Sequence, residues 1–394
     1  MQHLLPAGAV DPVWPIDGVG VCTATGDQKG VSIVADGSGG AILVWGDGRS
    51  FATNNYDIYV QRLSNGGVSL WTINGVALCD AQGLQENLTI VADNAGGAFV
   101  AWNDQRPGAN SRDIFAHHVT NLGVRDSSWP TQGAVLSSAI GDQELPKIVL
   151  DGASGAIVGW QDLRSGSDYE VFAQRVSGSG STQWATNGVP AASGTGFRQV
   201  VQVVSDGAGG ALLAWADFIG GDIYAQRLAA NGAVASGWPM NGTAVCTATG
   251  PQTSPTLISD AGNGGIIAWD DGRVSGDANI FAQRVTSGGE AGPTTGVPNQ
   301  VSRSLEMSIK PNPAIEPVTI RLVVDVESLV DLRIHDLQGR EVACLAHGVL
   351  LSAGVHELLW PLSSSVGHRV QPGLYFARAS IGMTRITRSM VVME

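Results

Sequence analysis

The chain has 394 residues, enough for one large and one small domain, and carries a formal net charge of −13. The segment from residue 308 onward holds eight basic and eight acidic residues, so the negative charge belongs to the part before it. Such an acidic surface argues against nucleic acid and anionic membranes as partners. No run of about 18 apolar residues occurs, so no membrane insertion is expected, and the first ten residues lack the pattern of a secretory signal.

One sequence unit is repeated five times, and its first copy begins at Val34 as VADGSGGAILVWGDGR and continues into DIYVQRL. The copies share a Trp-x-Asp element, at Trp45 and Asp47, Trp102 and Asp104, Trp160 and Asp162, Trp215 and Asp217, and Trp269 and Asp271. Successive anchor tryptophans are 57, 58, 55 and 54 residues apart, which suits one blade of a β-propeller. Short apolar runs separated by Asp-Gly turns, without helical periodicity, predict four strands in each unit.

The ends of the repeat predict how the blades close. Residues 10–22 match the fourth strand of later copies, whereas the fifth copy stops after Val285 without a fourth strand. We therefore expect an all-β, five-bladed propeller over residues 1–285, with the N-terminal strand completing the last blade and removing the open edges. This part resembles generic five-bladed β-propeller repeat proteins. A second set of five tryptophans supports the count: Trp14, Trp71, Trp129, Trp184 and Trp238.

Two further segments follow. Residues 286–307 are rich in Gly, Pro, Ser and Thr and are expected to form a flexible linker. Residues 308–394 contain alternating apolar runs separated by turns, which predict a small β-sandwich of the immunoglobulin type.

The C-terminal segment opens with Lys310-Pro311-Asn312-Pro313, continues with IHDLQGREVACL and AGVHELLW, and ends with TRSMVVME. In this order the motifs resemble the C-terminal sorting domain of type IX secretion cargo, and equally the immunoglobulin-like domain of flagellar hook-capping proteins. The resemblance implies an export machinery as partner and a location outside the cell or on the outer-membrane surface. The chain ends in Met393-Glu394, where such tails usually close on a basic strand. An accessory sandwich without a sorting role is the alternative.

The repeated Trp-x-Asp-x-Arg element is interpreted as structural, because catalysis needs one asymmetric site and not five copies. Each Asp is expected to lie between two arginines, as Asp47 between Arg49 and Arg62. Cys22, Cys79 and Cys246 share one repeat position, and equivalent positions in neighbouring blades diverge, so free thiols are expected.

A ligand site is predicted on the face where the innermost strands begin. One residue of each copy stands eight positions before its turn Asp and forms a ring: Gln28, Gln85, Gln143, Arg198 and Gln252. The loops after the Trp-x-Asp element open on the same face and vary most, as binding loops do. They carry aromatic residues that could stack on sugar rings: Phe51, Tyr56, Tyr169 and Phe218.

His117 and His118 replace the usual Gln-Arg of the third strand, and neighbouring strand residues point to opposite faces. No metal site and no cofactor are expected from this pair or from the Asp-Gly turns.

These patterns favour a monomeric, secreted or cell-surface binding or adhesion propeller that is not an enzyme, with a glycan or a surface protein as partner. Repeated blades would give repeated weak, lectin-like sites. A glycoside hydrolase is one alternative, and it requires carboxylates from different blades; Asp27, Asp142 and Glu144 are the only acids expected nearby. A structural surface or matrix protein is the other alternative.

Overall fold

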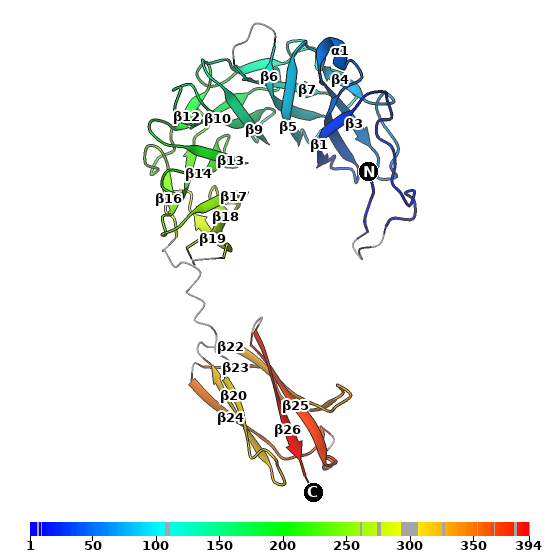
Figure 1. Ribbon diagram of the computed structural model, residues 1–394, viewed down its shortest axis with the longest axis vertical. Helices are drawn as coiled ribbons and strands as arrows, with labels where there is room; N and C mark the ends of the chain where they lie inside the picture. The colour runs from blue at the N-terminus through cyan, green and yellow to red at the C-terminus, as the bar shows by residue number, and fades with distance from the viewer. Residues whose placement is uncertain are drawn as a thin grey trace. The chain divides into compact units, whose positions relative to one another are not determined.

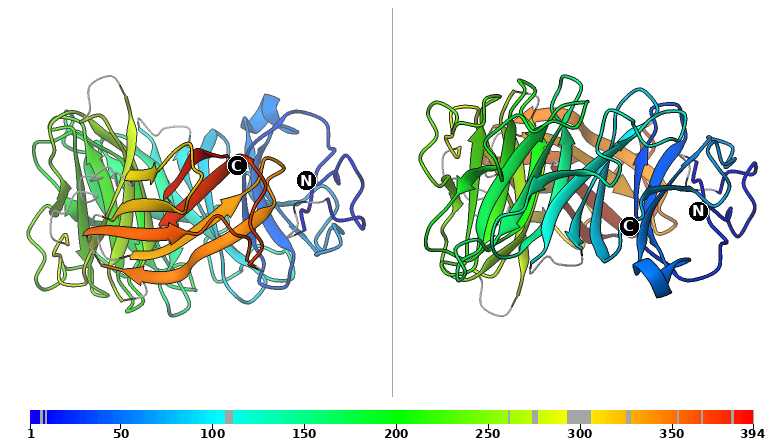
Figure 2. Two further views of the ribbon diagram at one scale, coloured as in Figure 1. Left: turned by 90° about the horizontal axis from the view of Figure 1, so that it is seen from below. Right: turned by 90° about the horizontal axis from the view of Figure 1, so that it is seen from above.

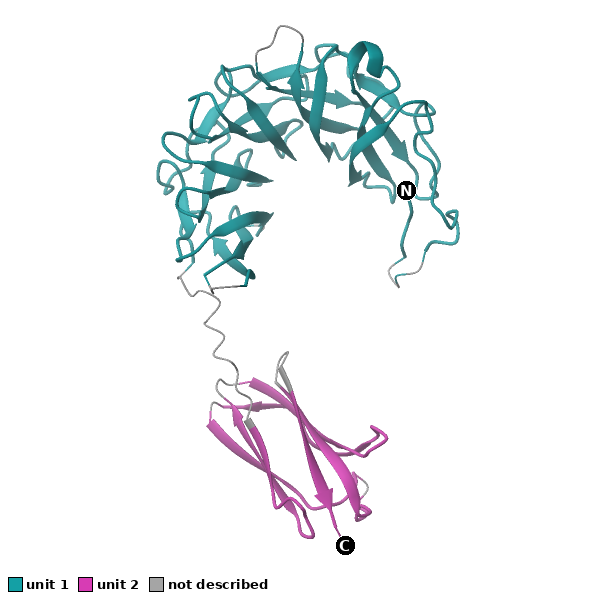
Figure 3. Ribbon diagram, in the orientation of Figure 1, with its two compact units in different colours: residues 1–294 teal, residues 295–394 magenta. Residues whose placement is uncertain are grey.

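The computed structural model describes the chain except residues 6, 7, 9, 107–110, 261, 274–276, 293–305, 325–327, 353, 366, 382, 383 and 394. It divides into two units, residues 1–294 and residues 295–394, here called the repeat unit and the sandwich unit (Figure 3). The boundary between them falls inside the predicted linker 286–307. The first part of that linker forms a turn in which Thr286 N–H donates to Glu290 O at 2.9 Å, and residues 293–305 lie outside the described residues.

The repeat unit consists of five antiparallel sheets formed in chain order (Figure 1). The first sheet contains β1 (Gln28–Ala35), β2 (Ala41–Asp47), β3 (Asp57–Leu63) and β4 (Val76–Cys79), with the short helix α1 (Phe51–Asn54) between β2 and β3. The second contains β5 (Leu84–Ala92), β6 (Ala98–Gln105), β7 (Asp113–Val119) and β8 (Ala134–Ser137). The third contains β9 (Gln143–Leu150), β10 (Ala156–Asp162), β11 (Glu170–Val176) and β12 (Val189–Ala192). The fourth contains β13 (Arg198–Ser205), β14 (Ala211–Asp217), β15 (Asp222–Leu228) and β16 (Thr243–Cys246). The fifth contains β17 (Gln252–Ser259), β18 (Gly265–Asp271) and β19 (Asn279–Val285).

The turn chemistry of the repeat explains the hairpins. In the third sheet the Asp151 carboxylate accepts the backbone N–H groups of Ala153 and Gly155 at 2.8 and 2.9 Å, which closes the turn between β9 and β10. Gly188 precedes β12 with a φ of +83°, and a Cβ there would lie 2.5 Å from the Trp160 ring. Glycine is therefore required at this position by both the backbone angle and the close approach of the tryptophan.

Tryptophans join each sheet to the next. The segment before each fourth strand places its Trp against the following sheet, as Trp129 Nε1 donates to Gly178 O at 2.8 Å. The same contact recurs from Trp14 to Asn65, Trp71 to Asn121, Trp184 to Ala230 and Trp238 to Ser287. Apolar clusters fill the space between successive sheets, which lie side by side (Figure 2). The hydrophobic core is thus a row of inter-sheet layers.

The predicted ring closure is not observed. The N-terminal segment packs Trp14 against Leu43 and Trp45 of the first sheet, as the other linking segments pack on the sheet that follows them. Among the described residues, however, it does not pair with β19. The fifth sheet has three strands, and the five sheets form an open arc within the repeat unit (Figure 1). Consequently Ile280 of the fifth sheet is 71% exposed, whereas its equivalent Ile223 in the fourth sheet is fully buried.

The sandwich unit contains seven strands in two sheets. One sheet pairs β20 (Glu306–Lys310), β21 (Val318–Val324) and β24 (Gly354–Trp360). The other pairs β23 (Glu341–Leu351), β22 (Ser328–His335), β25 (Gly373–Ile381) and β26 (Thr384–Val392). Alternate residues face inward, so Ile320, Leu332 and Trp360 are fully buried in one core. Among the described residues of the chain, no helix is long and apolar enough to cross a membrane.

Candidate functional site

The Trp-x-Asp-x-Arg element forms a buried ion pair at the end of the second strand of each sheet but the fourth. In the third sheet Asp162 accepts hydrogen bonds from Trp160 Nε1 at 2.8 Å and from Arg164 Nε at 2.8 Å. The Arg164 guanidinium also lies 3.6 Å above the Phe172 ring, a cation–π contact. Equivalent pairs join Asp47 to Arg49, Asp104 to Arg106 and Asp271 to Arg273. These carboxylates are fully buried, which makes the element part of the framework.

The second predicted arginine of this element binds elsewhere. Arg175 pairs with the turn residue Asp151 at 2.8 Å and not with Asp162. The strand register explains the difference: Arg175 lies opposite Ile157 near the start of β10, whereas Asp162 ends that strand. The equivalent pairs are Arg62 with Asp36, Arg227 with Asp206 and Arg284 with Asp260. The expectation of one Asp between two arginines was therefore wrong, because the two arginines belong to opposite ends of the sheet.

The predicted ring residues lie at the start of each innermost strand and turn back onto the preceding loop. Gln143 donates from Nε2 to Gly141 O at 2.7 Å, and Gln252 donates to Gly250 O at 2.7 Å. Gln28 donates to Gly26 O at 2.9 Å, and Gln85 lies within reach of Ala81 O and Tyr56 O. Gln85, Gln143 and Gln252 are buried. Their contacts hold the loop between two sheets, and a ligand-binding role for them stays a prediction.

The fourth sheet departs from the repeat at two linked positions. Ile219 replaces the arginine, and Arg198 replaces the ring glutamine, with its Nε 3.8 Å from Asp217. Arg198 also donates to Gly194 O at 2.9 Å, so it performs the loop contact of the glutamine as well. Trp215 Nε1 is buried and has no hydrogen-bond partner among the described residues. The fourth sheet thus keeps an arginine near this carboxylate, but the arginine comes from the first strand and not from the loop after the second.

An asymmetric charged cluster lies on the same face, between the second and third sheets. Arg112, just before β7, donates from Nε to Glu86 on β5 at 3.0 Å and from Nη1 to Glu144 on β9 at 3.0 Å. Its backbone N–H donates to the Asp142 carboxylate at 2.8 Å, and Tyr169 donates from its hydroxyl to Glu144 at 3.2 Å. We call these five residues the Arg112 cluster.

The cluster is charged and accessible to solvent. The Arg112 side chain is 34% exposed, and the Glu86 and Glu144 side chains are 36% and 19% exposed. Burial opposes the charged form of Arg112, but the carboxylates around it raise its pKa above the ordinary value. Burial and the Glu144 carboxylate raise the pKa of the Tyr169 hydroxyl, so it remains a hydrogen-bond donor. Three carboxylates thus surround one permanent cation.

An aromatic row extends from the cluster to the fourth sheet. The Tyr169 ring meets Phe197 edge to face at 5.2 Å, and Phe197 meets Phe218 at 6.3 Å. The backbone fixes this order, because Arg198 N–H donates to Tyr169 O at 3.1 Å and Phe218 N–H donates to Phe197 O at 2.9 Å. The structure therefore joins two of the predicted aromatic residues, Tyr169 and Phe218, through a third.

The other two predicted aromatic residues belong to the first sheet. Phe51 packs against Tyr56 at 5.0 Å, and the Lys29 ammonium lies 3.5 Å above the Tyr56 ring. They form a separate pair beside that sheet. Asp27, also in this region, makes no ion pair with a described residue.

The prediction from sequence missed Glu86, Arg112 and Phe197. The signal lay in the repeat itself. The position after the ring residue holds Lys29, Glu86, Glu144, Gln199 or Thr253, and the position before the third strand holds Tyr56, Arg112, Tyr169, Gly221 or Ala278. Side chains from these two positions meet in each of the first three sheets. The contact between these two positions is repeated, but the residues that make it differ from sheet to sheet. The charged residues of the Arg112 cluster are therefore a departure from the repeat.

His117 and His118 lie on β7, toward the end of the second sheet that is opposite the Arg112 cluster. His118 lies between Asp93 and Asp126, with ring nitrogens 2.9 and 2.8 Å from their carboxylates, and borders a hollow of about 390 Å³ between the second and third sheets. His117 is fully buried and stacks on Trp129 at 5.8 Å. Among the described residues no group of three His, Cys, Asp or Glu side chains is placed to hold a metal ion.

No protein-family model and no curated protein matches the chain. Solved structures do. A protein of unknown function from Dyadobacter fermentans is 11% identical, with 85% of this chain and 94% of that chain covered and a TM-score of 0.42. An α-L-arabinanase from Penicillium chrysogenum is 13% identical, with 85% and 93% covered and a TM-score of 0.40. An exo-β-1,3-galactanase from Clostridium thermocellum is 10% identical, with 79% and 80% covered and a TM-score of 0.33.

The expectation that the chain is not an enzyme is contradicted by these structures, among which glycoside hydrolases recur. The five-fold repeat led to that expectation, because the Arg112 cluster is not part of the repeated motif.

Proposed function

We propose that the repeat unit is a carbohydrate-active module that binds a saccharide along the Arg112 cluster and the aromatic row. Sugars present apolar C–H faces, which stack on aromatic rings, and hydroxyl groups, which bond to carboxylates and guanidinium groups. The observation that carries the proposal is the link between the two features: Tyr169 belongs to the row and donates to Glu144 of the cluster at 3.2 Å.

The same cluster supplies the groups that cleavage of a glycosidic bond requires. Most glycoside hydrolases use two carboxyl groups on either side of the bond, one as acid and one as nucleophile or base. Glu86 and Glu144 come from different sheets and are held by neighbouring nitrogens of one guanidinium. Glu144 accepts bonds from both Arg112 and Tyr169 and is assigned the nucleophile or base role. Glu86 accepts one bond from Arg112 and is the second carboxyl group of the pair.

The test is an assay of the full chain against arabinan, galactan and a panel of defined oligosaccharides, with reducing ends and equilibrium binding measured together. The wild-type protein is expected to bind at least one glycan and to release reducing ends from it. Glu144→Gln, which keeps the size of the side chain, should reduce the rate by a factor of at least about 10³ while binding persists. Arg112→Gln should weaken binding as well.

Glu290→Gln is the matched control, since Glu290 is exposed and lies in the turn after β19, away from the cluster. Binding without release of reducing ends would limit the site to recognition and overturn the hydrolytic part of the proposal. Unchanged binding and hydrolysis in both Glu144→Gln and Arg112→Gln would show that the activity belongs to another site. If the wild-type protein bound none of the glycans, the entire carbohydrate proposal would be overturned.

We also propose that residues 308–394 direct export to the cell surface. Support comes from the order of the motifs that begin at Lys310-Pro311-Asn312-Pro313 and from the separate core of the sandwich unit. The test is fractionation of the source cells expressing the chain with and without these residues. Retention of the shortened chain inside the cell is expected, and equal surface delivery of both would overturn the proposal.

A further inference from the structure

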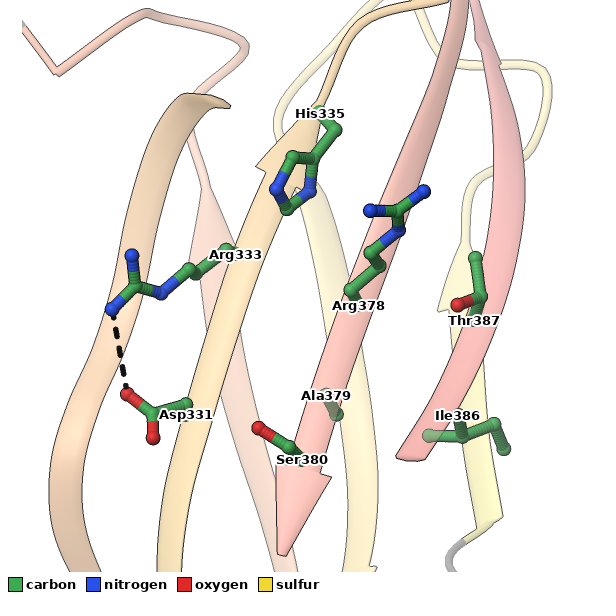
Figure 4. A pocket seen from close by; sticks show the side chains of 8 residues that line it. All are labelled: Asp331, Arg333, His335, Arg378, Ala379, Ser380, Ile386 and Thr387. Atoms are coloured by element: carbon green, nitrogen blue, oxygen red, sulfur yellow. Dashed lines mark ion pairs between the residues drawn. The ribbon is translucent and has the colours of Figure 1, made fainter. Parts of the chain in front are cut away.

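One outer face of the sandwich unit gathers polar side chains from three neighbouring strands. Asp331, Arg333 and His335 alternate along β22 and therefore share a face. The register places Arg378 of β25 directly opposite Arg333 and opposite Thr387 of β26. These residues line a hollow of about 470 Å³ together with Ser380 (Figure 4).

The two arginines of this face differ in their surroundings. Arg333 is neutralised, because its guanidinium lies 2.8 Å from Glu341 and 3.8 Å from Asp331. Asp331 in turn is bound by His347 at 2.7 Å. Arg378 has no carboxylate of a described residue within ion-pair distance, and it stands opposite another cation, an arrangement that costs free energy in a sheet.

Other donors beside Arg378 also lack partners. His335 Nδ1 is buried and makes no hydrogen bond with a described residue. The hydroxyls of Ser380 and Thr387 line the same hollow and donate to no described residue. Figure 4 shows the Arg378 guanidinium and the His335 ring turned toward the same space, while Arg333 turns away to Asp331. A group that accepts several hydrogen bonds and carries negative charge would satisfy Arg378 and the two hydroxyls.

We propose that this face binds an oxyanion, the phosphate or carboxylate group of a small molecule or a sugar acid. Arg378 supplies the charge and two parallel N–H donors, the geometry that favours carboxylate and phosphate groups. Ser380 and Thr387 donate their hydroxyls, and the His335 ring lines the hollow beside them. Arg333 and Asp331 form the wall of the site. The proposal is independent of the carbohydrate site on the repeat unit.

Histidine resonances offer a direct test, since the chain has only seven histidines. The full-length protein, labelled at histidine, is titrated at pH 7 and constant ionic strength with inorganic phosphate, acetate and glucuronate. The His335 signal is expected to shift and saturate with a dissociation constant on the order of 1 mM, whereas His356 on the other sheet stays unchanged. Arg378→Gln should weaken binding at least about tenfold.

The control is Arg321→Gln, which removes the same charge from an exposed residue of β21 in the other sheet. Ser380→Ala is the second variant and should weaken binding several-fold without removing charge. Glucuronate binding more tightly than acetate assigns a sugar acid, and equal affinity assigns recognition of the anionic group alone. A shift that rises linearly without saturation, or equal affinities in Arg378→Gln and Arg321→Gln, would overturn the proposal.

Discussion

Two charged groups on one face of the repeat unit differ in how often they occur and in how far they are exposed to solvent. The Asp162–Arg164 pair has equivalents in three other sheets, and its carboxylate is fully buried. The Arg112 cluster occurs once, and its Arg112 side chain is 34% exposed. A contact that every sheet needs is repeated with the sheet, whereas a ligand needs one arrangement only. In a repeat protein, departure from the repeat is therefore a better guide to function than the repeated motif.

The largest effect should come from the repeated element. Asp162→Ala leaves the Arg164 guanidinium and Trp160 Nε1 without the carboxylate that binds both, so unfolding of the repeat unit should be easier by roughly 3–5 kcal/mol. Tryptophan fluorescence during denaturation measures this, because ten of the eleven tryptophans lie in the repeat unit.

The fourth sheet supplies the control for that experiment. Asp217 receives bonds from the backbone N–H groups of Phe197 and Ile219 at 3.4 and 3.1 Å, and none from Trp215 Nε1. Asp217→Ala should therefore cost only about 1 kcal/mol. Equal losses in the two variants would show that the Trp–Asp–Arg contacts do not distinguish the sheets.

The second effect depends on pH and sharpens the contrast within the second sheet. Burial lowers the pKa of His117 from 6.5 to about 4. Between these values the unfolded chain binds more protons than the folded chain, so stability is complete above about pH 6.5 and falls as the pH decreases toward about 4. The loss amounts to at most about 3 kcal/mol.

His117→Gln should remove this acid sensitivity. The other four sheets have glutamine here, and Gln226 donates to Pro239 O at 2.8 Å, a contact that the introduced glutamine would make to Pro130. Denaturation at pH 7.5 and pH 4.5 measures the slope, with His356→Gln, at a half-buried histidine of the sandwich unit, as control. An unchanged slope in His117→Gln would exclude His117 as its source.

The third effect concerns the aromatic row and rests on the carbohydrate proposal. Phe197 is 37% exposed, and its edge-to-face contacts join Tyr169 to Phe218. Phe197→Ala should weaken glycan binding about tenfold, which corresponds to about 1.4 kcal/mol, and change stability by less than about 0.5 kcal/mol. Phe51→Ala, at an exposed aromatic outside the row, is the control. Equal binding by both variants would separate the row from the ligand.

The sequence predicted the sheets well because their causes are local. Trp160, Asp162 and the Asp151 turn act within one hairpin, and their spacing identifies the strands directly. Closure requires the segment that carries Trp14 to pack on the first sheet and also to pair with β19, and only the packing is observed among the described residues.

The candidate site was predicted only in part for a related reason. Tyr169, Phe218, Asp142 and Glu144 lie at positions that the repeat identifies as variable loops or strand starts. Arg112 binds Glu86, 26 residues before it, and Asp142 and Glu144, 30 and 32 residues after it. No spacing rule predicts which loop residue reaches which neighbouring sheet. Such contacts between sheets become visible only when the register of both is known.

The smallest effect tests whether the fourth sheet can be returned to the repeat. Arg198→Gln combined with Ile219→Arg should recreate the pair seen at Asp162 and Arg164, and the new arginine would stack on Tyr224 as Arg164 stacks on Phe172. We expect the double variant to gain about 1 kcal/mol of stability. Arg198→Gln alone removes the cation that lies 3.8 Å from Asp217, and Ile219→Arg alone places two cations beside one carboxylate. Both single variants should therefore be less stable than the double, with a coupling energy of about 0.5–3 kcal/mol in a double-mutant cycle. Additive effects on the free energy of unfolding would show that Arg198 and Ile219 do not compensate each other.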